Sequence, residues 1–148
     1  MIVLPGVWED AIRQEGERAY PNECCGILLG RIRDDGKSAE GIIPIHNARE
    51  AEEQYHRFRI DSEDLMRAEM EARKQNRDVL GFYHSHPDHP ARPSDYDKDH
   101  ALPFYSYIIV AVERGKAAEL TSWELTPNRA QFLEEKVCFG TREGEICQ

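Results

Sequence analysis

The sequence contains no long hydrophobic segment. None of its apolar runs approaches the ~18–20 residues of a transmembrane helix. The first ten residues, MIVLPGVWED, include no Lys or Arg and are already acidic at Glu9, which does not fit a signal peptide. A membrane span and a secretory leader are therefore not expected, and the cytoplasm is the predicted location.

Basic residues are comparatively few. The chain has 19 Lys and Arg against 28 Asp and Glu, which gives a formal net charge of -9. An acidic surface repels the phosphates of nucleic acids and of anionic membranes, so neither is expected as a partner. The fractions of hydrophobic and charged residues, 40% and 32%, are those of an ordinary soluble globular protein.

The cysteines do not form a Cys-x-x-Cys pair, so a structural zinc knuckle is not expected. The four are Cys24, Cys25, Cys138 and Cys147. Cys24 and Cys25 lie in an apolar run and are typical of small buried residues. A disulfide from either of them to Cys138 or Cys147 is not predicted in a reducing compartment.

The length of 148 residues indicates one domain, 1–148, with a core over about 2–125 and a tail over 126–148. Hydrophobic periodicity predicts helices over 7–20 and about 62–75. It predicts strands over 2–4, 23–33, 39–46, 79–83, 105–112 and 117–125, with a further short strand near Phe132 or Val137. The pattern is α+β, with hairpins prominent.

Two segments are predicted to be loops. Residues 47–57 are polar, and residues 58–60 after them are β-like. Residues 84–93 contain three prolines, and a short helix from Asp95 to about Leu102 is predicted to follow them, capped by Ser94.

Most of the potential metal ligands lie in one stretch, 79–97, which reads VLGFYHSHPDHPARPSDYD. A metallo-β-lactamase-like site would use His84, His86, Asp88 and His89, but His100 is the only later histidine and the chain is short for that fold. A cupin also begins from His-x-His and needs a Glu shortly downstream, and residues 87–94 contain none. Both alternatives are therefore disfavoured.

A third set of ligands is His84, His86 and Asp97. Two histidines at alternate positions of a strand end point the same way, so both can face one ion. A helical turn that begins at Ser94 can return Asp97 to that ion. A His, His, Asp set with an open fourth position is typical of catalytic zinc, although cobalt or iron also suits these ligand types.

The spacing His84-Ser85-His86, seven residues, Ser94, two residues and Asp97 resembles the signature of the JAMM or MPN-plus metallopeptidases. Glu23 in NECCGILLG is similar to the upstream Glu of that family, and the surrounding letters resemble its short prokaryotic members. The resemblance implies a cytidine-deaminase-like α+β fold, with a curved, mostly antiparallel sheet flanked by helices. Base deamination itself is argued against, because the His-x-Glu and Pro-Cys-x-x-Cys motifs of zinc deaminases are absent.

The resemblance also implies a zinc-dependent peptidase or isopeptidase. One Zn²⁺ per chain would be bound by His84, His86 and Asp97, would polarise the amide carbonyl and would lower the pKa of water towards ~7. Glu23 would act as the general base, which takes the proton of the water and passes it to the leaving amine. Ser94 would donate a hydrogen bond to the developing oxyanion.

The implied substrate is a ubiquitin-like or sulfur-carrier protein with an extended C-terminal tail. Such a tail can add to a sheet edge, and residues 47–60 are the expected place. The second insertion of eukaryotic deubiquitinases is absent here, because Asp97 leads almost directly into the strand at 105–112. This argues for processing a carrier protein rather than polyubiquitin. The non-enzymatic alternative is a scaffold module of the same fold, and the sequence does not indicate an oligomeric state.

Overall fold

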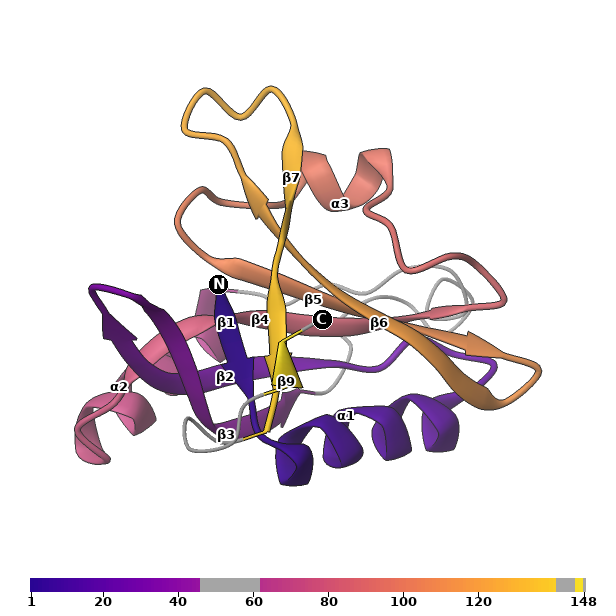
Figure 1. The fold of residues 1–148 in the computed structure, drawn as a ribbon, viewed down its shortest axis with the longest axis horizontal. Helices are drawn as coiled ribbons and strands as arrows, with labels where there is room; N and C mark the ends of the chain where they lie inside the picture. Colours follow the sequence, from indigo (N-terminus) through magenta and orange to yellow (C-terminus); the bar gives the residue numbers. More distant parts are fainter. Residues whose placement is uncertain (46–61, 141–145, 148) are drawn as a thin grey trace.

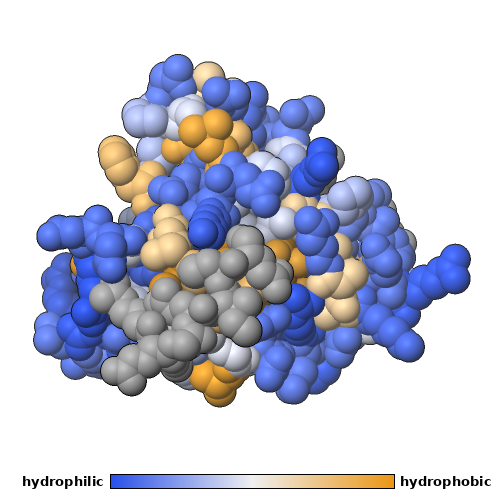
Figure 2. Space-filling view, in the orientation of Figure 1, coloured by the Kyte–Doolittle hydropathy of each residue, from blue (hydrophilic) through white to orange (hydrophobic). Residues whose placement is uncertain are grey.

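The computed structural model describes residues 1–45, 62–140 and 146–147. The predicted loop 47–57 and the β-like residues 58–60 lie outside the described residues. Among the described helices, none is both long enough and apolar enough to cross a membrane. The face of the molecule in Figure 2 is largely hydrophilic, with smaller apolar patches between the polar side chains.

The described strands form one sheet in the order β7-β6-β5-β4-β2-β3-β1-β8-β9 (Figure 1). Their bounds are β1 Ile2–Leu4, β2 Cys25–Arg33, β3 Gly36–Ile45, β4 Asp78–Pro87, β5 Ser106–Glu113, β6 Lys116–Leu125, β7 Phe132–Glu135, β8 Val137–Phe139 and β9 Ile146–Cys147. The helices are α1 Gly6–Ala19, α2 Ser62–Lys74 and α3 Asp95–Asp99. The predicted elements are thus recovered, with differences at their ends.

The sheet is mixed but mostly antiparallel. The pairs β1–β3, β1–β8 and β4–β5 are parallel, and the other five pairs are antiparallel. This confirms the expected α+β class and the curved, mostly antiparallel sheet flanked by helices. The parallel pairs join segments that are distant in sequence, which is why local hairpin patterns did not indicate them.

Helices cover both faces of the sheet. Ile12 of α1 packs in a core with Leu28 and Val110, whereas Ala68 and Ala72 of α2 pack in a second core on the other face. β2 contributes to both cores, because its successive side chains alternate between the faces. This explains why the sequence of β2 is a nearly continuous apolar run.

The segment 126–148, predicted to be a tail, contributes β7, β8 and β9 to the sheet. Cys138 in β8 is disulfide-bonded, and the β8–β9 register places Cys147 opposite it. Cys24 and Cys25 are buried and free, in agreement with the prediction for this pair.

Two boundaries were predicted wrongly: α3 ends at Asp99 rather than at about Leu102, and β4 continues through His84 and His86 to Pro87 instead of ending at Tyr83. The reason for the longer β4 is tertiary pairing. β5 runs parallel to this end of β4, with His84 opposite Ile109 and His86 opposite Ala111. Pro87 is tolerated because it is the last residue of the strand, where a missing N–H costs little. The loop therefore begins at Asp88.

Candidate metal centre

The C-terminal end of β4 carries two buried histidines. β4 lies between β2 and β5, with Cys25 and Ile109 opposite His84. His84 is 1% exposed and His86 is 6% exposed. Because alternate residues of a strand share a face, both rings project to the same side of the sheet. Pairing on both sides holds this strand end, and with it the two rings, in a defined position.

The third residue of the cluster, Asp97, is supplied by α3. Ser94 is the N-cap of this helix, and its Oγ accepts a hydrogen bond of 3.1 Å from the Asp97 N–H. In return, the Ser94 N–H donates to Asp97 Oδ2 at 2.8 Å, which completes a capping box. The helix start therefore fixes the position of the carboxylate.

The three side chains converge on one point. His84 Nε2 and His86 Nε2 are 3.1 Å apart, and Asp97 Oδ2 is 3.4 Å from the first and 3.2 Å from the second. A tetrahedron with zinc–ligand bonds of ~2.0–2.1 Å has edges of about 3.3–3.4 Å. The donor atoms and their spacing therefore fit a tetrahedral metal ion with one position left for water or substrate.

A hydrogen bond to the backbone favours the tautomer of His86 that can bind a metal through Nε2. Its Nδ1 lies 2.8 Å from the carbonyl oxygen of Pro90, so Nδ1 carries the proton and donates. The Nε2 lone pair is then directed at the cluster. A histidine that ligates a metal commonly makes such a bond with its second nitrogen, which fixes both tautomer and ring orientation.

Electrostatics favour the protonation states that a metal needs. Burial lowers the pKa of His84, which keeps its imidazole neutral and able to ligate. Burial alone would raise the pKa of Asp97, but His84, His86 and the Ser94 N–H hold it far below the usual range of a carboxyl. The cluster thus presents the neutral imidazole of His84 and the carboxylate of Asp97 at neutral pH.

Glu23 lies next to this cluster in the backbone pairing. It is 7% exposed and precedes β2. Cys24 and Ser85 are hydrogen-bonded between the strands, and Cys25 is opposite His84. Continuing this register by two residues places Glu23 opposite His86, on the face that His84 shares. This register places the backbone of Glu23 beside the strand end that carries the two histidines, and its catalytic role stays a prediction.

Asp88 and His89 lie outside the cluster. Among the described residues, the only group of three or more potential ligands is His84, His86 and Asp97. Asp88 instead accepts hydrogen bonds from the Tyr20 hydroxyl at 2.6 Å and the Arg114 N–H at 2.8 Å. His89 is exposed. The described residues therefore do not assemble the metallo-β-lactamase-like set.

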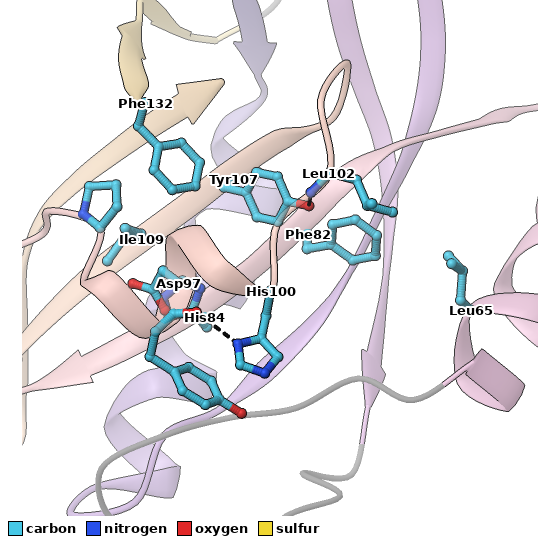
Figure 3. Close-up of a pocket in the computed structure, with 11 residues that line it drawn as sticks. Leu65, Phe82, His84, Asp97, His100, Leu102, Tyr107, Ile109 and Phe132 are labelled. Atoms are coloured by element: carbon cyan, nitrogen blue, oxygen red, sulfur yellow. Dashed lines mark hydrogen bonds and ion pairs between the residues drawn. The ribbon is translucent and has the colours of Figure 1, made fainter. Parts of the chain in front are cut away.

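A pocket of about 220 Å³ adjoins the cluster, with His84 and Asp97 in its wall (Figure 3). The rest of the wall is mainly apolar and aromatic, and comes from α2, β4, the segment around α3, β5 and β7. Its other members are Leu65, Phe82, Pro93, Tyr96, His100, Leu102, Tyr107, Ile109 and Phe132. Sequence reasoning did not identify this pocket, because strand periodicity marks such residues only as core.

The fold and the cluster define a JAB/MPN-type domain, and comparison with known proteins identifies the family. The family model described as prokaryotic homologs of the JAB domain matches residues 5–126. The chain therefore belongs to the prokaryotic JAB family, which confirms the resemblance found in the sequence.

The relatives include characterised and structurally solved proteins. A protein named desampylase from Haloferax volcanii is 32% identical over 118 residues, which cover 79% of each chain. A solution structure from Salinibacter ruber, 38% identical, covers 99% of this chain and 95% of that one, with a TM-score of 0.74. A JAB1/MPN domain protein from Archaeoglobus fulgidus shares the fold, with a TM-score of 0.56 at 19% identity over 93% of this chain and 98% of that chain.

Proposed function

We propose that this protein is a zinc-dependent peptidase or isopeptidase that hydrolyses amide bonds at the C-terminus of a ubiquitin-like or sulfur-carrier protein. The observation that carries the proposal is the convergence of His84 Nε2, His86 Nε2 and Asp97 Oδ2 within 3.1–3.4 Å of one another. The relationship to the desampylase supports a protein modifier as the substrate. The proposed location is the cytoplasm.

His84, His86 and Asp97 would hold one Zn²⁺ per chain. When bound, the ion would polarise the amide carbonyl and lower the pKa of water in the site towards ~7. The Asp97 carboxylate would balance one of the two positive charges and the neutral imidazoles none, so the site would keep a net positive field for the developing oxyanion.

Glu23 is proposed as the proton carrier. The water oxygen bonds to the carbonyl carbon while Glu23 accepts a proton from the water. Glu23 then gives this proton to the amide nitrogen as the C–N bond breaks, so the products are a carboxylic acid and an amine. The register that places Glu23 opposite His86 supports this role, because the residue is buried and is not one of the three converging side chains.

Ser94 is proposed as the oxyanion donor. Its Oγ accepts the hydrogen bond from the Asp97 N–H, so the hydroxyl proton itself is directed elsewhere. A hydroxyl so placed beside the ligand Asp97 can donate to an oxygen that gains charge during the reaction. Capping of α3 and oxyanion stabilisation are compatible, because the first uses a lone pair and the second uses the proton.

The proposal is tested by incubating zinc-loaded protein with carrier-protein conjugates that differ in the group attached at the C-terminus. Cleavage is followed as a mass change, with Glu23→Gln and chelator-treated protein as controls. We expect the wild type to release the carrier with a free C-terminal carboxylate and both controls to be inactive. Zinc binding without cleavage of any conjugate would favour a scaffold module instead.

A further inference from the structure

The pocket beside the metal cluster has the size of a single side chain. Its volume of about 220 Å³ is below the ~300–1,000 Å³ of pockets that bind drug-sized ligands. We propose that it is a substrate subsite that receives one bulky apolar side chain, aliphatic or aromatic, from a residue adjoining the cleaved amide. That an amide is cleaved beside the pocket rests on the function proposed above. The preference of the pocket for a bulky apolar side chain does not depend on it.

The strand register places the apolar part of the pocket directly beside the metal ligands. Phe82 is paired with Tyr107, and two residues further along His84 is paired with Ile109. Two residues of a strand span about 7 Å. A substrate whose amide lies at His84 therefore has a neighbouring side chain within reach of Phe82 and Tyr107.

Aromatic rings give this part of the wall a defined shape. The ring centroids of Phe82 and Tyr107 are 5.4 Å apart in a stacked arrangement. Phe132 of β7 meets Tyr107 edge-on at 5.7 Å. In Figure 3, the three rings lie along the side of the pocket away from His100. Large apolar side chains gain most from such a surface, through area burial and ring contacts.

Two polar side chains of the wall away from the metal ligands form hydrogen bonds within the protein. The Leu102 N–H donates to the Tyr107 hydroxyl at 2.7 Å, and His100 Nδ1 contacts the Tyr96 carbonyl oxygen at 2.9 Å. Burial raises the pKa of Tyr107 to about 12, so this hydroxyl is uncharged at neutral pH. A charged side chain would lose its water against these mainly apolar walls, and glycine would leave the walls without contacts.

The first test uses conjugates that differ only in the residue on one side of the cleaved amide, with Phe, Leu, Gly or Asp at that place. One series varies the carbonyl side and a second varies the amine side. In one of the two series, kcat/KM for Phe and Leu should exceed that for Gly by at least about tenfold, with Asp lowest. Cleavage with no such preference in either series would overturn the subsite.

Matched variants locate the preference in the pocket. Phe132→Ala should reduce the Phe-to-Gly ratio of kcat/KM by about tenfold, whereas Leu133→Ala, at the next position of β7 and 56% exposed, should not change it. Leu65→Trp should narrow the pocket and lower the same ratio, with Met66→Trp, 64% exposed, as its control. Zinc content and the thermal midpoint identify any variant that fails to fold.

A binding measurement separates the subsite from the reaction. N-acetyl-phenylalaninamide and N-acetyl-glycinamide are titrated into zinc-loaded Glu23→Gln protein and followed by NMR. We expect the phenylalanine compound to bind at least about tenfold more tightly, to shift resonances of Leu65 and Ile109, and to lose this advantage in Phe132→Ala. This result without cleavage of any conjugate would refute the proposed function but retain the subsite. Equal binding of the two compounds would refute the subsite even if the protein is an active peptidase.

Discussion

Two buried polar clusters lie on opposite faces of the central strands. At the end of β4, His84, His86 and Asp97 bring lone pairs together. On the other face, Lys37 Nζ is 2.7 Å from Ser106 Oγ, and Ser106 in turn donates to Glu135 Oε1 at 2.7 Å. The second cluster contains its own cations, Lys37 and the N-terminal ammonium 3.5 Å from Glu135 Oε2, whereas the three converging groups of the first include no Lys or Arg.

The difference explains which cluster is a site. Ser122 also donates to Glu135, at 2.8 Å, and these hydrogen bonds hold the pKa of Glu135 below its usual value although burial alone would raise it. Charge and hydrogen bonds are therefore satisfied within the protein, as a structural cluster requires. The His84 cluster directs two imidazole nitrogens and a carboxylate oxygen at one point, which is the arrangement that could hold a cation from solution.

The largest expected effect comes from removing a ligand of the metal cluster. His84→Ala and Asp97→Ala should each lose stoichiometric zinc and all detectable cleavage, because two remaining ligands do not hold the ion. Elemental analysis of the purified protein and the conjugate assay measure the two losses. Zinc retained at one equivalent in either variant would contradict the assigned ligand set.

The next largest effect is expected at Glu23, where loss of the proton carrier should be distinguishable from loss of the metal. Glu23→Gln should keep zinc at the wild-type level but lower kcat by ~10²–10⁴, the usual contribution of a general base. Metal content and steady-state rates are measured on the same preparation. Turnover within a few fold of the wild type would remove Glu23 as the base.

Loss of the Ser94 hydroxyl should have a similar or smaller effect. Ser94→Ala is expected to lower kcat by up to ~10²–10³ if the hydroxyl stabilises the oxyanion. Its removal also deletes the cap of α3, which should destabilise the fold by ~0.5–2 kcal/mol. Comparison with Ser94→Gly distinguishes the two roles, because glycine restores most of the capping stability but no hydroxyl. Equal recovery of rate and stability in Ser94→Gly would refute the oxyanion role.

Disruption of the cluster around Glu135 should lower the stability of the protein and leave its zinc content unchanged. Lys37→Met removes one cation from the buried cluster and leaves Glu135 with the N-terminal ammonium at 3.5 Å, which is expected to cost ~1–3 kcal/mol in the free energy of unfolding. Lys116→Met at the exposed start of β6 is the matched control and should change stability little. Denaturant unfolding and zinc analysis are the measurements. A loss of zinc in folded Lys37→Met would contradict the separation of the two clusters.

The smallest effect is expected at Asp88, which the sequence offers as a metal ligand but which lies outside the cluster in the structure. Asp88→Ala should leave zinc content unchanged, because Asp88 bonds to Tyr20 and Arg114 and is absent from the convergent group. Elemental analysis of the variant beside the wild type is sufficient. Loss of the metal would restore the metallo-β-lactamase-like hypothesis.

The convergent group of His84, His86 and Asp97 could be predicted from sequence because its spacing is local and chemically specific. His84 and His86 are two residues apart, and Ser94 to Asp97 is one helical turn whose start follows from capping preferences. Only Glu23 required a longer-range comparison, and the family resemblance supplied it. The sheet class followed equally from strand patterns, which alternation and turn residues mark well.

Features that depend on distant pairing were not predicted. The extension of β4 through His86 arises from pairing with its parallel neighbour β5. In the same way, β1 lies between β3 and β8, which are more than 30 and more than 130 residues away in the sequence. Lys37 and Glu135 are far apart in sequence, and neither belongs to a motif. The pocket likewise joins Leu65 to Phe132, residues whose side chains read as ordinary core positions when each strand or helix is considered separately.

The capping box has a consequence for how the active site can be lost during evolution. Asp97 has two duties, since its carboxylate begins α3 by accepting from Ser94 and also faces the two histidines. Selection for a stable helix start therefore preserves this aspartate even in a lineage that no longer binds metal. A descendant that became a scaffold could therefore keep Asp97 after it stopped binding metal, so this aspartate alone does not identify an active member.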